Sequence, residues 1–246
     1  MTLFNRAYAD GDQLKVGDTL VTLKVHRRAR RVSLRLDRAR GEIVATAPSA
    51  RRLHEAAAFA VERAGWIAAR IAELPAAPNV AAGMVLQIFG QPVLLASSEG
   101  RARWWPAADL SPARISAMGE GEGYARAVVL MVRRHALEVM TARTAVYAER
   151  LGAPMPKVAM ADAKGRWGSC RPGRAGQPGS VRYSWRLALA PFAVADYVAA
   201  HECAHLLELN HGPRFWAHVK ALVGDHRPHR EWLRAEGPRL HAFGRT

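Results

Sequence analysis

The feature that most constrains the fold of this chain is a pair of histidines four residues apart, His201 and His205, with Glu202 beside the first. On an α-helix such a pair lies about 40° apart around the axis and about 6 Å apart along it, so both imidazoles can reach one ion. Neutral imidazole is a good ligand for zinc, and Glu202 is placed to act on a water at the metal instead of binding it. The spacing therefore predicts a helix that carries a metal site.

The residues before this pair favour a helix. Pro191 stands at a suitable first helical position, and apolar residues follow it at helical spacing up to Val198. Cys203 falls about 200° from His201 around the axis, so we expect its side chain to be buried in the core. The alternative is that the sulfur of Cys203 is a further metal ligand.

The third ligand decides which kind of site this is. Structural zinc sites are closed by four protein ligands, whereas hydrolytic sites use three and leave the fourth position to water. We take His211 as the third ligand, although six helical steps from His205 turn the chain by about 600°. The helix must therefore end first, and we predict that Asn210 adopts the left-handed conformation that stops it, before residues 212–213 open a new helix. The alternative ligands are Glu208 and His218.

Further motifs accompany these histidines in a fixed order. They are Arg166-Trp167-Gly168-Ser169-Cys170, Trp185-Arg186-Leu187, and the run from Asn210 through Trp216. Over roughly residues 15–235 the chain resembles the YgjP-like zinc metallopeptidases, relatives of the SprT-like proteases. The resemblance implies a zincin-type catalytic half with zinc bound by His201, His205 and His211. It also implies that Glu202 is the catalytic acid and base.

Arg166 is a second candidate catalytic residue. Its guanidinium group would stabilise the anionic tetrahedral intermediate of peptide hydrolysis, because the developing negative charge benefits from a positive donor beside the metal. The alternative is a structural role, in which Arg166 ties its loop to a long helix through an ion pair. Tyr183 is a weaker candidate for hydrogen bonding to the transition state.

The N-terminal third alternates in polarity with period two. Residues 19–47 predict three strands, separated by breaks at 27–30 and 37–41 that are typical of hairpin turns. We therefore expect an antiparallel meander, and then a helix that Ser49 can cap. The next expected segments are a linker at residues 75–83 and strands at 84–89, 93–96, 102–105 and 113–117.

The C-terminal half predicts mainly helices. A long helix is expected over residues 124–151 as a backing for the metal-bearing helix, because apolar positions recur along it and Gly152 follows. Strands are expected at 157–161 and 180–185, with residues 166–170 as a loop between them. A helix at 213–223 and a last short helix from residue 225 complete the chain.

The expected fold class is therefore α+β. A small antiparallel β-rich N-terminal part precedes a zincin-like catalytic part, which combines a long backing helix, a short sheet and the histidine-bearing helix. The predicted divisions are a meander with a helix at residues 1–74, a linker with hairpins at 75–122, and a catalytic domain at 123–246.

Basic side chains exceed acidic ones, with 36 lysines and arginines against 21 aspartates and glutamates and a net charge of +15. Such a field favours acidic partners, including nonspecific contact with nucleic acid through the basic surface. A solvated surface without a specific partner is the simpler interpretation. The sequence contains no zinc finger, helix-turn-helix signature or aromatic RNA-binding motif that would favour a specific role.

No apolar stretch of the sequence is long enough to span a bilayer, so we expect no membrane partner. The two cysteines, Cys170 and Cys203, provide no disulfide framework, which fits a reducing cytoplasm.

The sequence thus predicts a zinc-dependent metallopeptidase with Zn²⁺ as its cofactor and a polypeptide as its substrate. Peptide bonds would be hydrolysed by a zinc-bound water that Glu202 activates. Two alternatives stay open: a zinc-stabilised basic nucleic-acid-binding module without turnover, and a protease that acts on DNA-associated proteins.

Overall fold

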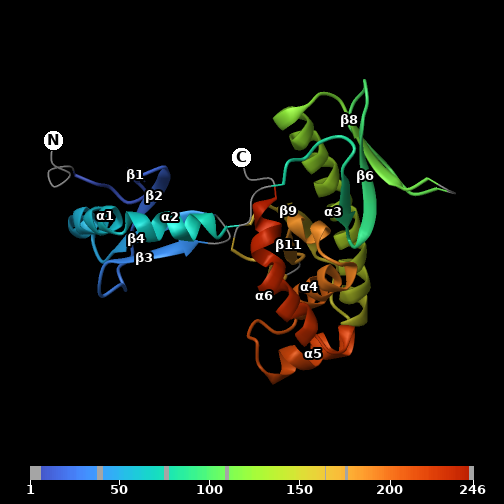
Figure 1. Cartoon of the computed structure of the whole chain (residues 1–246). Coiled ribbons are helices and arrows are strands. Elements are labelled where there is room, and N and C mark those ends of the chain that lie inside the picture. The colour runs from blue at the N-terminus through green and yellow to red at the C-terminus, as the bar shows by residue number, and fades with distance from the viewer. Residues whose placement is uncertain are drawn as a thin grey trace. The chain divides into compact units, whose positions relative to one another are not determined.

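The computed structural model describes residues 7–37, 41–74, 78–108, 111–163, 165–174 and 177–243. The chain divides into two compact units, Met1–Ala76 and Ala77–Thr246 (Figure 1). Within the described ranges the fold is α+β, with three small sheets and six α-helices. None of these helices is both long and apolar enough to cross a membrane. The first three residues of the part from 75 to 83 that we predicted as a linker lie outside the described residues, and Val80 is buried in the core of the second unit.

The first unit is a four-stranded sheet covered by helices. Its elements are β1 (Gln13–Val16), β2 (Thr19–Val25), β3 (Ser33–Asp37), β4 (Glu42–Ala47), η2 (Ala50–Arg52), α1 (Leu53–Glu62) and α2 (Ala64–Ala72). The strand order is β1-β2-β4-β3, with β2 and β4 parallel and the two outer pairs antiparallel. The predicted antiparallel meander is therefore wrong, and β1 was not predicted.

Burial explains why β2 pairs with β4. Leu23 of β2 and Ile43 and Ala45 of β4 are fully buried beneath α1, and strands buried in this way occupy the centre of a sheet. In β3, Ser33 and Arg35 are exposed, so this strand can lie at the solvent-facing edge of the sheet. A simple meander would have placed the polar β3 between the two apolar strands.

The second unit contains the remaining elements. They are β5 (Val85–Ile88), β6 (Gln91–Ser97), β7 (Arg103–Trp105), β8 (Ala113–Ala117), α3 (Gly121–Arg150), β9 (Lys157–Ala161), β10 (Gly168–Arg171), β11 (Ser180–Ser184), η3 (Trp185–Leu189), α4 (Phe192–Ala204), α5 (Pro213–Val223) and α6 (Arg227–Ala242). The sheet β5-β6-β8-β7 repeats the strand order and the pairing directions of the first unit.

The hairpin between β5 and β6 turns at Phe89 and Gly90, whereas the strands predicted at 84–89 and 93–96 would place the turn at residues 90–92. Both residues have positive φ, 50° and 78°, as two-residue hairpin turns of this kind require. Phe89 is a strained choice for this position, but its side chain is buried and its N–H donates to the carbonyl of Ala188 at 2.6 Å. These tertiary contacts hold the turn against the core.

The third sheet has the order β10-β11-β9, with β10 antiparallel and β9 parallel to β11. The predicted loop at residues 166–170 is therefore partly wrong, because β10 begins at Gly168. Its sequence, Gly-Ser-Cys-Arg, lacks the β-branched and aromatic residues that mark strands. Pairing with β11 and packing against α4 determine its conformation instead.

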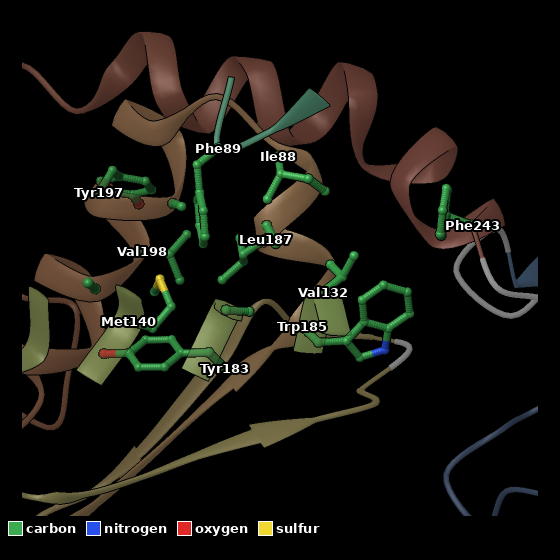
Figure 2. Packing of buried hydrophobic residues seen from close by; sticks show 14 of the residues in the cluster. Ile88, Phe89, Val132, Met140, Tyr183, Trp185, Leu187, Tyr197, Val198 and Phe243 are labelled. Carbon is green, nitrogen blue, oxygen red and sulfur yellow. The ribbon is translucent and has the colours of Figure 1, made fainter. Parts of the chain in front are cut away.

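The core of the second unit lies between α3, α4 and the β11–η3 segment. Helix α3 buries a stripe of residues at helical spacing, among them Val132, Ala136 and Met140. Figure 2 shows Tyr183, Trp185 and Leu187 packed together with Val132, Met140 and Val198. Helix α3 thus packs directly against α4, as we expected of a backing helix.

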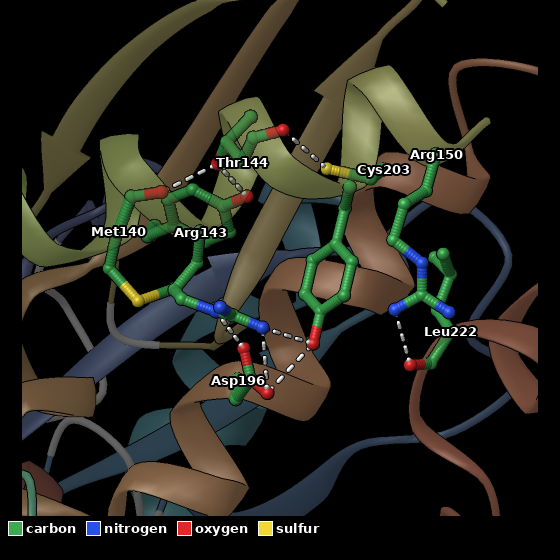
Figure 3. Close-up of polar contacts among 9 residues, drawn as sticks. Met140, Arg143, Thr144, Arg150, Asp196, Cys203 and Leu222 are labelled. Carbon is green, nitrogen blue, oxygen red and sulfur yellow. Dashed lines mark hydrogen bonds and ion pairs between the residues drawn. The ribbon is translucent and has the colours of Figure 1, made fainter. Parts of the chain in front are cut away.

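A polar network also joins α3 to α4 (Figure 3). Arg143 Nε donates to Asp196 Oδ1 at 2.6 Å, and the Tyr147 hydroxyl donates to Asp196 Oδ2 at 2.7 Å. Burial, with a further contribution from Asp196, raises the pKa of Tyr147 to about 12, so this hydroxyl keeps its proton. Asp196 lies five residues before His201, and the network therefore sets the position of α4 along α3.

We predict that Asp196→Ala lowers the free energy of unfolding by about 2–3 kcal/mol, because Arg143 and Tyr147 lose a charged acceptor in a mostly buried position. Chemical denaturation measures the change. The matched control is Glu138→Ala, which removes an exposed carboxylate 3.6 Å from Arg134 and should leave the stability unchanged. Equal effects of the two substitutions would contradict the proposed anchoring of α4.

Candidate metal centre and active site

The histidine pair lies at the C-terminal end of α4. His201 belongs to the helix, and His205 is its C-cap with φ −68° and ψ −12°, so the helical spacing of the two rings is kept. Cys203 is fully buried and its Sγ donates to the carbonyl of Thr144 at 3.8 Å. The prediction that Cys203 faces the core is confirmed, and its thiol points toward α3.

The chain reverses after α4, but not in the way we predicted. Helix α4 ends at Ala204, and among the described non-glycine residues a positive φ occurs only at Phe89, so the left-handed conformation predicted for Asn210 is wrong. The residues after α4 instead form successive tight turns, and Gly212 N–H donates to the carbonyl of Asn210 at 2.7 Å. Helix α5 then begins at Pro213, as expected. This reversal brings His211 back toward α4.

Three imidazoles meet as a result. Nε2 of His211 lies 3.1 Å from Nε2 of His201, and one ring nitrogen from each of His201, His205 and His211 lies within 4.8 Å of the others. Tetrahedral zinc with ordinary bonds to histidine separates two ligand nitrogens by about 3.4 Å. The three rings therefore fit one zinc ion. Among the described residues the group has no fourth member, and it excludes the runner-up ligands, the Glu208 carboxylate and His218.

Partners on the second ring nitrogens orient two of these rings. Nδ1 of His205 donates to the carbonyl of Glu208 at 2.9 Å, which leaves the Nε2 lone pair free for a metal. Nδ1 of His201 lies 3.3 Å from the hydroxyl of Tyr197. The sequence prediction missed Tyr197 as a site residue and treated it only as an apolar position of the helix. Its position four residues before His201 was the available signal.

The surroundings of His201 and His205 favour the neutral form of these two rings. Burial, followed by the charges of His205 and His211, lowers the pKa of His201 to about 3. Burial also lowers the pKa of His205. A neutral imidazole is the form that binds a metal, so these positions are ready to bind without first releasing a proton.

Glu202 is buried beside this cluster, with 5% of its surface exposed. Burial raises its pKa to about 7, and the positive charge of Arg166 acts in the opposite direction. Strand β10 packs directly on the carboxylate: a Cβ at Gly168 would lie 2.5 Å from Glu202 Oε1. Gly168 is thus required by close packing, and only the folded structure could show this.

Arg166 is exposed, and its charge reaches Glu202. No carboxylate of the described residues forms an ion pair with it, so the alternative of a tie to α3 receives no support. The neighbouring Trp167 stacks on His241 of α6 with ring centroids 4.5 Å apart, which fixes the segment that carries Arg166. Tyr183 is not available to a substrate, because it is fully buried and its hydroxyl lies 2.8 Å from Thr144 Oγ1.

A model of the YgjP-like metallopeptidase domain matches residues 30–236, most of the chain. The chain belongs to the YgjP-like metallopeptidase family. Comparison with curated proteins and with solved structures gave no match. The family description names a metal-dependent hydrolase of peptide bonds, and the resemblance inferred from the motifs is confirmed.

The raised pKa of Glu202 makes a prediction for the metal-free YgjP-like domain. Between pH 4.5 and about 7 the folded protein holds a proton that the unfolded chain has released, so this group's contribution to stability falls as the pH rises. Glu202→Gln removes that contribution. The free energy of unfolding of the variant, relative to the wild type, should therefore increase across this interval by up to about 3 kcal/mol.

Urea denaturation of both proteins in the presence of a chelator, at several pH values, measures this difference. Taking the difference between the unfolding free energies of variant and wild type removes the contribution of His201. The lowered pKa of His201 makes that contribution rise with pH, opposite to that of Glu202. A difference that does not change with pH would show that Glu202 titrates normally.

Proposed function

We propose that the protein is a zinc-dependent metallopeptidase that holds its metal through His201, His205 and His211 and transfers protons through Glu202. The observation that carries the proposal is the meeting of three ring nitrogens within 4.8 Å beside one buried carboxylate. Membership of a metallopeptidase family supports it. A structural zinc site needs only its four protein ligands, so a buried carboxylate that is not a ligand favours a catalytic site.

Zinc held by these imidazoles would supply Lewis acidity, which activates a water and polarises the carbonyl of a peptide bond. A carboxylate oxygen of Glu202 accepts the proton of the attacking water and then passes it to the nitrogen of the leaving amine. Burial raises the pKa of Glu202 to about 7 in the metal-free protein, and this environment favours a carboxyl group that both accepts and donates a proton near neutral pH.

The remaining residues hold these groups in place. The carbonyl of Glu208 and the hydroxyl of Tyr197 orient the rings of His205 and His201. Gly168 lets β10 pack closely against the Glu202 side chain and limits its movement. We assign to Arg166 the stabilisation of the anionic tetrahedral intermediate, since its charge is close enough to lower the pKa of Glu202.

The open ligand set favours hydrolysis over the alternative of a closed structural site. A closed site would need one fourth protein ligand, for which Cys203 and Glu208 are the two candidates. Cys203 is directed at Thr144 in the core, and the Glu208 carboxylate lies 3.9 Å from Arg214. Both therefore have other partners, which supports a position left for water.

We expect Glu202→Gln to retain zinc and to lower the hydrolysis of an unfolded protein substrate by about 10²–10⁴-fold, the range for loss of a general acid–base group. Zinc content by elemental analysis and cleavage followed on gels measure the two properties. The matched control is Glu208→Gln, which should retain both zinc and activity.

Two results would contradict the proposal. Full activity of the Glu202 variant would remove its proton-transfer role, and loss of zinc from the Glu208 variant would favour a closed site. A chelator should abolish the wild-type activity, and added zinc should restore it.

A further inference from the structure

Two cavities adjoin the candidate active site, and both include Arg166 and Gly168 in their walls. The first, of about 380 Å³, we call the α6 cavity. It is lined by Arg166, Trp167, Gly168, Tyr197, Val198, His201, Glu202, Arg230, Leu233 and Arg234. Since His201 and Glu202 form part of its wall, a side chain bound there would belong to a residue close to the bond being cleaved.

The walls of the α6 cavity combine apolar surface with positive charge. Val198 and Leu233 supply an apolar wall, whereas Arg166, Arg230 and Arg234 supply three guanidinium groups. Arg230 and Arg234 are one helical turn apart on α6 and lie on the same face. The guanidinium carbon of Arg230 lies 5.0 Å from the ring centroid of Trp216, which supports this side chain at the cavity.

The arginines of α6 divide into two kinds. Outside the cavity, Arg227 pairs with Asp225 at 2.9 Å and Arg239 lies 3.6 Å from Glu236. By contrast, none of the three arginines in the cavity wall forms an ion pair with a carboxylate in the described part of the chain. The three arginines beside Glu202 thus have no ion-pair partner within the described ranges, whereas Arg227 and Arg239 on the same helix each have one.

The second cavity, of about 350 Å³, has the same character. It lies along β10 and β11, and Arg171 and Arg182 line it together with Arg166. The hydroxyl of Ser184 also belongs to its wall, is buried, and has no hydrogen-bond partner among the described residues. Both spaces beside the candidate site thus offer hydrogen-bond donors and positive charge.

We propose that the α6 cavity binds a carboxylate of the substrate, next to the peptide bond that is cleaved. The inference rests on the proposed function and deepens it: the substrates are acidic polypeptide segments. Arginine binds carboxylates through paired, charge-assisted hydrogen bonds, and Arg230 and Arg234 are free to make them. The apolar wall accepts the methylene groups of a glutamate side chain. The same carboxylate chemistry is available from an aspartate or from a C-terminal residue.

Peptides that differ in one group test the inference on the zinc-loaded full chain. One peptide carries a single glutamate and an amidated C-terminus, a second carries glutamine instead, and a third carries glutamine with a free C-terminal carboxylate. We expect kcat/KM to favour a carboxylate-bearing peptide over the neutral one by about tenfold to a hundredfold, as for a charge-assisted contact. Comparing the glutamate peptide with the peptide that has a free C-terminus shows whether the cavity prefers a side-chain or a C-terminal carboxylate.

Substitutions on α6 connect this preference to the cavity. Arg230→Gln combined with Arg234→Gln should bring the ratio of the two kcat/KM values close to one. Arg230→Glu combined with Arg234→Glu should make a lysine peptide the better substrate, a gain that misfolding cannot produce. The matched control, Arg227→Gln with Arg239→Gln, removes the same charge from the same helix and should leave the ratio unchanged.

The outcomes separate this inference from the proposed function. Hydrolysis without a charge preference, or a preference that the Arg230 and Arg234 variants retain, overturns the inference and leaves the peptidase intact. If the wild type cleaves none of the peptides, fluorescence anisotropy of the same peptides decides the inference, and the proposed function fails only if an unfolded protein substrate also stays intact. The inference is supported if the wild type binds the carboxylate peptide more tightly than the neutral one and the Arg230 and Arg234 variants lose this difference. Equal binding of the two peptides by the wild type overturns the inference. If the variants lose DNA binding while their peptide preference stays unchanged, the arginines form a nucleic-acid-binding surface and the inference is overturned.

Discussion

Three imidazoles can share one small volume only if they stay neutral, because protonated rings at this distance repel one another. Here burial lowers the pKa of His201 to about 3, and the carbonyl of Glu208 fixes the tautomer of His205. The burial of His201 needs α4 to be held firmly against its neighbours. The packing of α3 on α4, together with the contact of Arg143 with Asp196, provides that support. The chemistry of the site therefore depends on a helix interface some distance from it.

Much of this site could be predicted from the sequence, because its main signals are local. The spacing of His201 and His205 requires a helix, and Gly212 with Pro213 indicates where the next helix opens. The position of His211 followed from those two facts, even though the predicted conformation of Asn210 was wrong. A chain that must reverse within a few residues has several ways to do so, and the sequence does not choose among them.

The errors concern contacts between segments that are distant in the chain. Strand direction in the first sheet depends on which strands are buried most, and β10 exists because β11 and α4 lie beside it. The role of Gly168 appears only when β10 is packed on Glu202. Likewise, the composition shows an excess of arginine, but only the fold distinguishes Arg230 from the paired Arg239. Periodicity and spacing carry no information of this kind.

The central claim is that three imidazoles hold one zinc ion and leave a position for water. X-ray absorption spectroscopy of the zinc-loaded wild-type protein tests it most directly, because the spectrum reports the atoms bound to the metal. The account predicts imidazole nitrogens at about 2.0–2.1 Å from three histidines and one further light atom from solvent. A sulfur in the first shell, or a fourth histidine, would contradict it.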